Sequence, residues 1–468
     1  MPEEEESPRR SGLRRISLDD FSAPYDLIAD DIFGSRVGLE PPWDIFVGGL
    51  SALRDARVRI ANRAVCVKVN RPRIDLEPAI NQLAGNLPCY WLSYWLEKEV
   101  LFWALAFDGV PIDGGEIRLS DDVALRESLT IVTVANRLQT RWRVDPTLDV
   151  NLDHRLARAD SFDEITLTAP LAALIPPALR TTSETPRRLI LSPAPELAGI
   201  PWPIIPVDPE VQPTRRLIEE FELHFAPSLA SLADVPPREQ LQPAAQIPFL
   251  FSCDFYPDDP SPIAARGARV RFGPSSRIAT ESEVQPATSE GLLRTLAEIR
   301  PGAYGLGYFR THFQWQEFAP TESGFVLEDD LLPSGWLFVA DAGRPLAGLP
   351  SRLILSCCST TGLRGRFGGE SLGLVAASMW CGAREIIATS IDVRQTAFTN
   401  ALDEMLIKMA LTSACHIGGL RALQLRLLNE WRRYSALGIA DDDGGDWSPS
   451  PAIWAYYQAC GLRRTDAA

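Results

Sequence analysis

A histidine and a cysteine, each placed directly behind an apolar run, are the residues of this chain with the clearest chemical potential. His312 follows the run Tyr304–Phe309, and Cys358 follows the run Leu353–Ser356. An isolated cysteine, with a pKa of about 8.5, is mostly protonated at neutral pH, whereas a thiol beside an imidazole becomes an activated thiolate. This pair therefore indicates an activated cysteine nucleophile.

The remaining histidines and cysteines are better explained as structural residues. His154 and His224 have no candidate nucleophile near them in the sequence, and His416 stands just before a Gly-Gly pair, which is typical of a helix end or turn. A free cysteine is usually a small buried core residue, and we expect this of Cys381 and Cys460. The eight cysteines form no C-x-x-C pair and no zinc-type spacing, so the sequence predicts no metal site.

The two apolar runs belong to a series of short strands that alternate with helices. Continuous apolar runs bounded by turn residues are typical of strands buried on both faces of a parallel sheet; they cover Arg188–Leu191, Pro248–Ser252, Tyr304–Phe309, Leu353–Ser356 and Ile386–Thr389. Apolar residues at three- and four-residue spacing predict helices over Gly291–Ile299, Glu370–Trp380, Ala397–Leu411 and Gly418–Trp431. This alternation predicts a three-layer α/β domain. Its strands can bring His312 and Cys358 together, because functional groups gather at the carboxyl ends of parallel strands.

A smaller β-rich unit is predicted before this domain. The apolar and aromatic runs Cys89–Leu96 and Val100–Phe107 are separated by three charged residues, which predicts a β-hairpin. We therefore divide the chain into four parts: a disordered tail over 1–18, an N-terminal extension of unknown role over 19–85, an N-terminal subdomain over 86–185 and a catalytic subdomain over 186–462. Long loops are predicted over 233–247, 254–289 and 439–451.

The overall charge argues against two classes of partner. The 468 residues include 46 Lys and Arg against 61 Asp and Glu, for a net charge of −15. Proteins that bind duplex nucleic acid or membrane surfaces rely on an excess of Lys and Arg. The first residues contain no apolar signal-peptide core, and no apolar stretch reaches the roughly 18 residues of a spanning helix. We expect a cytoplasmic protein with reduced thiols that contacts neither nucleic acid nor membrane.

The residues around Cys358 resemble a known family. Leu355–Thr360, which reads L-S-C-C-S-T, is similar to the L-S-A-C-x-T signature of CHAT-domain cysteine peptidases, relatives of caspases and separase. Further blocks resemble this family in the same order: Pro201–Ile205, Phe225–Ser228, Thr311–His312, Ser323–Leu327, Gly369–Ile387 and Pro451–Tyr457. The resemblance implies a caspase-like three-layer α/β/α fold with a mostly parallel sheet, preceded by a smaller β-rich, pseudo-caspase-like subdomain.

The resemblance also implies a role for each site residue. His312 would be the general base and Cys358 the nucleophile, while Cys357 takes the position of the family's alanine and would be structural. The backbone N–H groups of Cys358 and of the residue after the histidine would form the oxyanion hole. That residue is Phe313 here, where the family has glycine. Asp392 resembles the separase carboxylate that receives a basic P1 side chain, since a carboxylate pairs well with arginine. No cofactor and no metal are implied.

The function implied is that of a bacterial cysteine endopeptidase that cleaves a protein substrate through a thioester. Members are commonly regulated and act in defence or cell death, so a separate activating or sensor protein is an expected partner. One alternative is a catalytically silent CHAT-like interaction module, with Phe313 as the inactivating change. A second alternative is a serine hydrolase, because Gly369–Gly373 matches the G-x-S-x-G nucleophile elbow around Ser371. A glycine-rich loop precedes that serine, however, where the elbow requires a strand.

Overall fold

The structure is a computed structural model, and it describes eleven segments of the chain. These are residues 87–129, 168–226, 248–252, 269–272, 288–292, 305–314, 324–333, 350–360, 374–391, 397–437 and 449–461, with gaps at 98, 109, 184, 195–196, 198, 290–291, 328–330, 358–359, 381–382 and 414. The predicted tail and N-terminal extension over 1–85 and nearly all of the helix predicted over 291–299 lie outside these segments.

One mixed sheet of 11 strands forms the centre of the molecule, in the order β3-β2-β1-β4-β7-β16-β15-β14-β10-β8-β9. Its strands are β1 (Cys89–Glu97), β2 (Val100–Phe107), β3 (Val110–Arg118), β4 (Arg187–Ser192), β7 (Phe221–Phe225), β8 (Pro248–Ser252), β9 (Arg269–Phe272), β10 (Leu306–Arg310), β14 (Arg352–Leu355), β15 (Glu385–Thr389) and β16 (Tyr457–Gly461). Most neighbours run parallel; the antiparallel pairs are β3–β2, β2–β1, β15–β16 and β8–β9. This mostly parallel sheet confirms the predicted α/β fold.

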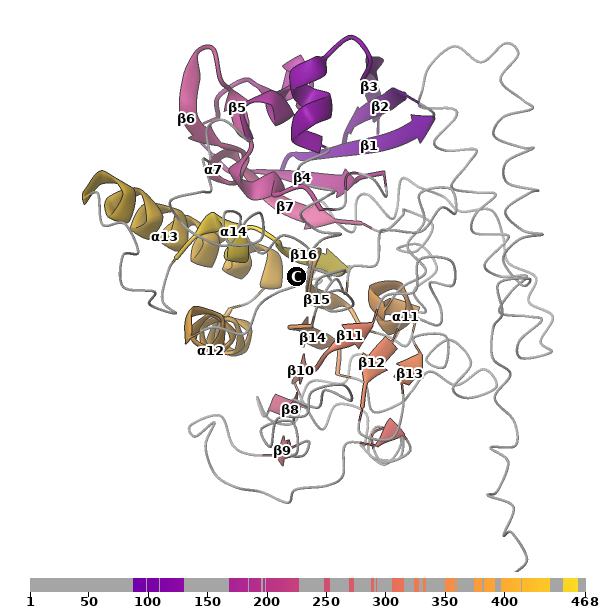
Figure 1. Ribbon diagram of the computed structural model, residues 1–468, viewed down its shortest axis with the longest axis vertical. Helices are drawn as coiled ribbons and strands as arrows, with labels where there is room; N and C mark the ends of the chain where they lie inside the picture. Colours follow the sequence, from indigo (N-terminus) through magenta and orange to yellow (C-terminus); the bar gives the residue numbers. More distant parts are fainter. Residues whose placement is uncertain are drawn as a thin grey trace, which may run out of the picture.

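Helices lie on both faces of this sheet (Figure 1). One face carries α12 (Ala397–Thr412), α13 (His416–Leu437) and the short α14 (Pro451–Trp454). The other face carries α11 (Leu374–Trp380) and a small antiparallel sheet of β11 (Phe313–Gln314), β12 (Gly324–Val326) and β13 (Leu331–Pro333). The arrangement gives three layers. The helices predicted over 397–411 and 418–431 are both present, and α13 continues to Leu437, beyond its predicted end.

The predicted hairpin is confirmed, and the structure extends it by a third strand. β1 and β2 pair antiparallel with Tyr90 opposite Phe107, and β2 then pairs with β3. Asp108 lies in the turn between β2 and β3 and has a φ of 46°. Its carboxylate accepts a hydrogen bond from the N–H of Cys89 at 3.0 Å. Sequence patterns missed β3 because Pro111 and two glycines suggest a loop. An edge strand tolerates these residues, and the indole of Trp103 covers one of the glycines.

The hairpin is continuous with the rest of the sheet, because β1 also pairs parallel with β4. Between β4 and β7 lie short elements that pack on the sheet: η4 (Trp202–Ile204), β5 (Pro206–Asp208), β6 (Gln212–Arg216) and α7 (Leu217–Glu220), with η1 (Pro170–Leu174) and η2 (Pro177–Leu179) before β4. Strands from both sides of the proposed boundary between 185 and 186 therefore belong to one sheet. The division into subdomains stays a prediction.

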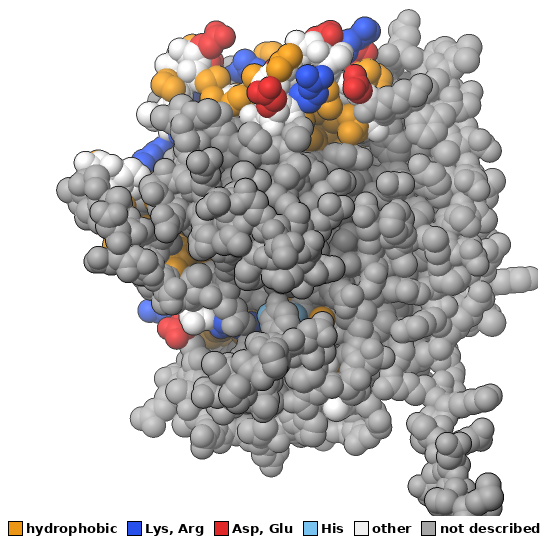
Figure 2. Space-filling model, viewed as in Figure 1, with side chains coloured by type: hydrophobic (Ala, Val, Ile, Leu, Met, Phe, Trp, Pro, Cys, Tyr) orange, Lys and Arg blue, Asp and Glu red, His pale blue; other side chains and the backbone are white. Residues whose placement is uncertain are grey.

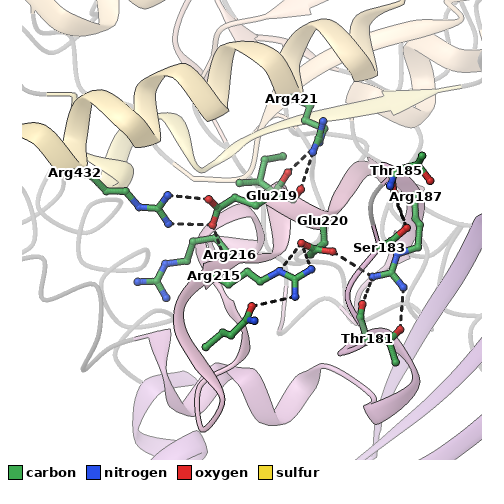
Figure 3. Close-up of polar contacts among 12 residues, drawn as sticks. Thr181, Ser183, Thr185, Arg187, Arg215, Arg216, Glu219, Glu220, Arg421 and Arg432 are labelled. Atoms are coloured by element: carbon green, nitrogen blue, oxygen red, sulfur yellow. Dashed lines mark hydrogen bonds and ion pairs between the residues drawn. The ribbon is translucent and has the colours of Figure 1, made fainter.

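Arginines of α13 fasten this helix to the segment around α7 (Figure 3). Arg421 donates to the backbone oxygens of Ile218 and Glu219 at 3.0 and 2.8 Å. Arg432 holds the Glu219 carboxylate with two hydrogen bonds of 2.8 and 3.0 Å. The first pair satisfies carbonyl groups at the end of a short helix, which have no partner within the helix. α13 is thereby anchored to a part of the chain about 200 residues earlier.

One of the predicted long loops contains a strand. Within 254–289, residues Arg269–Phe272 form β9, which pairs antiparallel with β8 and ends the sheet. The segment alternates Arg with Val and Phe, and charged residues of this kind are common on edge strands. The prediction of a continuous loop was wrong at this point, because the surrounding Pro and Asp residues dominate the local pattern.

Acidic, basic and apolar side chains are interspersed over the end of the molecule that carries β2, β3, β5 and β6 (Figure 2). The large exposed apolar side chains there include Val110, Ile112 and Val123. Within the part of the chain that the structure describes, no helix is both long and apolar enough to cross a membrane.

Candidate active site

The two strand ends that precede His312 and Cys358 are direct neighbours. β10 and β14 pair in parallel, with Gly307 opposite Leu353 and Phe309 opposite Leu355. The N–H of Ser356 donates to the Phe309 oxygen at 2.9 Å, so the pairing continues for one residue past β14. The expectation that these strands could be adjacent is confirmed. Cys358 itself lies outside the described residues.

Gly307 lets the two strands pack closely. A Cβ atom at this position would lie 2.8 Å from Leu353 Cδ2 and 3.2 Å from Pro350 Cγ. Both contacts are shorter than normal van der Waals separations, so the neighbours would have to shift. The glycine in the run Leu306–Arg310 therefore leaves room for the side chains of Leu353 and Pro350 between β10 and the start of β14.

His312 lies between β10 and β11, and hydrogen bonds to Val326 of β12 fix its backbone. Its carbonyl oxygen accepts the N–H of Val326 at 2.8 Å, and the Thr311 hydroxyl donates to the Val326 oxygen at 2.9 Å. The residue is half-buried, and its Nδ1 atom is shielded from solvent. The small sheet therefore fixes the backbone from which the imidazole extends.

Phe313 is part of the core. Its ring is 3% exposed and lies edge-to-face with Phe325 at a centroid distance of 6.1 Å, while Phe325 stacks on Phe309 at 5.8 Å. Phe313 and Phe325 are opposite each other in the β11–β12 pair, and the bond from Val326 to His312 makes them a non-hydrogen-bonded pair. The N–H of Phe313 consequently points away from β12.

Cys357 and Thr360, which follow β14, form hydrogen bonds with both neighbouring strands. The Cys357 thiol is buried and donates to the Phe309 oxygen at 3.3 Å, and the Thr389 hydroxyl donates to the Cys357 oxygen. Thr360 closes the turn, because its hydroxyl donates to the Leu355 oxygen at 3.3 Å and accepts the Thr389 N–H at 3.1 Å. Cys357 is thus a core residue.

A buried carboxylate lies next to these strand ends. Asp403 of α12 accepts the Ser356 hydroxyl at 2.5 Å and forms an ion pair with Arg310 at 3.7 Å. Tyr308 and Tyr457 also contribute to lowering the pKa of this carboxyl group, and the Tyr457 hydroxyl lies 3.1 Å from the Ser356 hydroxyl. We call these five residues the Asp403 cluster. Burial raises the pKa of Asp403 to about 6, and the hydrogen bonds and Arg310 oppose this rise.

The Asp403 cluster was missed in the sequence, although one signal was present. Along α12, Phe398, Leu402, Leu406 and Ala410 are buried at four-residue spacing, and Asp403 is buried beside them. A carboxylate within the apolar side of a helix is rarely buried unless it is paired. The pattern indicates a buried partner, but the partners come from three strands that are far apart in the chain.

The other described histidines are structural. Burial, followed by the charge of Arg188, lowers the pKa of His224 in β7 to about 3. Burial, followed by the charge of Arg352, lowers the pKa of His416 to about 3 at the first residue of α13. Both are therefore neutral at physiological pH. His154 lies outside the described residues.

The cysteines that the structure describes away from the strand ends are also core or partly buried residues. Cys460 is 4% exposed, which confirms that it is a core residue. Burial raises the pKa of Cys89 to about 12 and also raises the pKa of Cys460. Cys381, Ser371 and Asp392 lie outside the described residues. Among the residues that are described, no three His, Cys, Asp or Glu side chains are grouped so that they could hold a metal ion.

Comparisons with known proteins identify the family. The sequence matches the family model of the CHAT domain over residues 164–462, which is more than half of the chain. The chain therefore belongs to the CHAT-domain family. A search of curated proteins gave no match.

Among solved structures, the chain is similar to the Saccharomyces cerevisiae separase–securin complex. The two share 9% identity at a TM-score of 0.49, over 94% of this chain and 36% of that chain. The chain thus spans little more than a third of the length of that structure.

Proposed function

We propose that this protein is a cysteine endopeptidase in which His312 and Cys358 form the catalytic dyad. The observation that carries the proposal is the register of β10 and β14, because Phe309 lies opposite Leu355 and the dyad residues follow each of these by three positions. Membership of the CHAT-domain family supports the same assignment, since this family includes cysteine peptidases.

In the proposed reaction, the Cys358 thiolate attacks the carbonyl carbon of a peptide bond. The developing oxyanion is held by the N–H groups of Phe313 and Cys358, each contributing about 3 kcal/mol to the transition state. The C–N bond then breaks, and the imidazolium of His312 gives its proton to the leaving amine. His312 next takes a proton from water, which attacks the thioester and releases the carboxylic acid and the Cys358 thiolate, so that the starting thiolate and imidazolium are restored. The Phe313 N–H, directed away from β12, is available in orientation for this role.

The test compares new protein N-termini in cells that carry the wild-type chain or single variants. Cys358→Ala and His312→Ala should each remove the cleavage products. Cys357→Ala is the matched control, because it alters the neighbouring thiol and installs the residue that the family has there; it should retain cleavage. If Cys358→Ala leaves the products intact, the dyad assignment is wrong.

A catalytically silent interaction module remains the main alternative. It was suggested because Phe313 could be an inactivating change, and the packing of Phe313 argues against this. An inactivating side chain would have to occupy space that the substrate needs, whereas the Phe313 ring is buried against Phe325. A Cys358→Ala protein that produces the same cellular response as the wild type would support the silent module. Labelling of Ser371 by a fluorophosphonate, without alkylation of Cys358, would instead support a serine hydrolase.

For substrate choice, we propose that Asp392 binds a basic P1 side chain. A carboxylate forms paired hydrogen bonds with a guanidinium group, which favours arginine over other residues. A peptide library should show cleavage after Arg or Lys, and Asp392→Ala should abolish that preference. A wild-type preference for acidic or apolar P1 residues would show that the assignment is wrong.

For biological role, we propose a regulated peptidase of the bacterial cytoplasm that acts in defence or cell-death signalling on a protein substrate. A separate sensor protein would supply the activating signal. Affinity purification of the Cys358→Ala variant, which would retain bound substrate, should recover the substrate and any activator. Cleavage that is full with the purified chain alone would exclude a required activator.

A further inference from the structure

The Asp403 cluster joins the two strand ends that lead to the proposed dyad. Ser356, which bonds to Asp403 at 2.5 Å, stands two residues before Cys358. Arg310, which pairs with the same carboxylate at 3.7 Å, stands two residues before His312. Arg310 is also fixed to α12 by a hydrogen bond of 2.6 Å to Asn400, one helical turn before Asp403. One helix thereby holds both segments.

A buried carboxylate contributes little net stability to a sheet, because its burial carries a large desolvation cost. A buried carboxylate loses its hydration, and replacing buried charges with apolar residues of similar volume often leaves stability unchanged or improves it. The carboxylate accepts the Ser356 hydroxyl and pairs with Arg310, and the Tyr457 hydroxyl lies beside that of Ser356. The Asp403 cluster lies at the end of the sheet from which the segments with His312 and Cys358 continue. This position indicates that the cluster orients these two segments.

The opposite end of β14 provides a comparison. There Arg352 pairs with Glu385 of β15 at 2.8 Å and donates to the oxygens of Ala410 and Ser413 near the end of α12. This second ion pair lies between the same sheet and the same helix, but at the amino ends of β14 and β15. Its loss should therefore affect stability without affecting the orientation of His312 and Cys358.

We propose that Asp403 is a positioning residue of the active site, which fixes Ser356 and Arg310 so that the Cys358 thiol and the His312 imidazole stay together. The proposal rests on the proposed Cys358–His312 dyad. Without the carboxylate, the segments after β10 and β14 lose their shared anchor on α12. The thiol then moves away from the imidazole, and its thiolate fraction at neutral pH falls.

The experiment measures the rate of alkylation of Cys358 by iodoacetamide at pH 7, with the modified residue assigned by mass spectrometry. This reagent reacts with the thiolate, so its rate reports the thiol–imidazole pair without any substrate. Asp403→Asn, which keeps the size of the side chain, should slow the reaction by about tenfold. Glu385→Gln, the matched control, should stay within about twofold of the wild type. Equal rates for Asp403→Asn and Glu385→Gln would overturn the proposal.

A second variant keeps the proposal testable if Asp403→Asn does not fold. Ser356→Ala removes one donor and leaves the Asp403 carboxylate with Tyr308, Arg310 and Tyr457, so the sheet should remain intact. It should slow alkylation of Cys358 in the same direction. A thermal melt of each variant gives the change in stability, and a slower rate with a melting temperature equal to that of Glu385→Gln identifies positioning. An unchanged rate in Ser356→Ala contradicts it.

His312→Ala separates failure of this inference from failure of the proposed function. If Cys358 of the wild type reacts no faster than in His312→Ala, the dyad itself is wrong. If the wild type reacts quickly, His312→Ala slowly and Asp403→Asn as quickly as the wild type, the dyad stands and only the role of Asp403 is wrong.

Discussion

Phe309 and Leu355 lie opposite each other on the parallel strands β10 and β14. Parallel strands end at the same edge of a sheet, so the segments that begin at Arg310 and Ser356 leave the sheet side by side. The contact between Ser356 and the Phe309 oxygen maintains this relationship beyond the last paired residue. The spacing of the proposed dyad therefore depends on the packing of β10 against β14.

Substitution of Gly307 by alanine should disturb this packing. The added methyl group would lie 2.8 Å from Leu353 Cδ2, and overpacking of a buried site typically costs about 1–3 kcal/mol. We expect urea unfolding to show a loss within this range. Leu353→Val in the same chain should recover part of it, because it removes a methylene beside the added methyl. No loss of stability in Gly307→Ala would show that β10 and β14 have room between them.

Replacement of Phe313 by the family's glycine should weaken the fold without improving catalysis. Removal of a buried aromatic ring costs about 3–5 kcal/mol, and here it also removes the edge-to-face contact with Phe325. Phe313→Leu, which keeps most of the buried volume, should cost far less. Unfolding by urea checks both values. A Phe313→Gly protein that is as stable as the wild type would mean that the ring does not belong to the core.

Two neighbouring carboxylates of α7 should differ in their contribution to stability. The Glu220 side chain is 8% exposed and pairs with Arg187 and Arg215, whereas the Glu219 side chain is 29% exposed and pairs with Arg432 (Figure 3). Breaking a buried pair leaves uncompensated charge and costs about 3–5 kcal/mol, while a pair that is more open to solvent, such as Glu219–Arg432, is screened and contributes less. Glu220→Gln should therefore reduce the free energy of unfolding much more than Glu219→Gln. Equal losses would contradict the difference in burial.

The buried histidines should make stability depend on pH below neutrality. Burial, and then the charge of Arg352, lowers the pKa of His416 from 6.5 to about 3, so between these values the unfolded chain binds a proton that the folded chain does not. Stability therefore decreases as the pH falls from 6.5, by about 1.4 kcal/mol per pH unit for each such residue. His224, whose pKa is also lowered to about 3, acts in the same direction.

Asp403 acts in the opposite direction. Burial raises its pKa from 3.8 to about 6, so between these values the folded chain binds the proton, and this contribution increases stability as the pH falls. Between pH 6 and pH 5, His416→Gln should therefore reduce the slope of stability against pH by about 1.4 kcal/mol per unit, and Asp403→Asn should increase it. Urea unfolding at several pH values measures both slopes. Identical slopes in all three proteins would show that these groups titrate alike in the folded and unfolded chain.

Part of the fold could be predicted because its signals are local. The apolar runs that became β4, β8, β10, β14 and β15 are continuous in the sequence, and the hairpin of β1 and β2 has a short charged connection. β3 and β9 gave no such signal. Edge strands are half paired and accept proline, glycine and charged residues, so their composition resembles that of loops.

By itself, the sequence determined the residue types that could react, their position behind apolar strands, and the ordered blocks by which the CHAT-domain family is identified. Only the tertiary structure decided that β14 lies next to β10, that the ring of Phe313 is in the core, and that Asp403 gathers Tyr308, Ser356 and Tyr457. The physical reason is that periodicity and turn residues record how each segment meets water, which is a local property. Strand order and buried hydrogen bonds depend on which distant segments pack together, and the partners of Asp403 are spread over about 150 residues of chain.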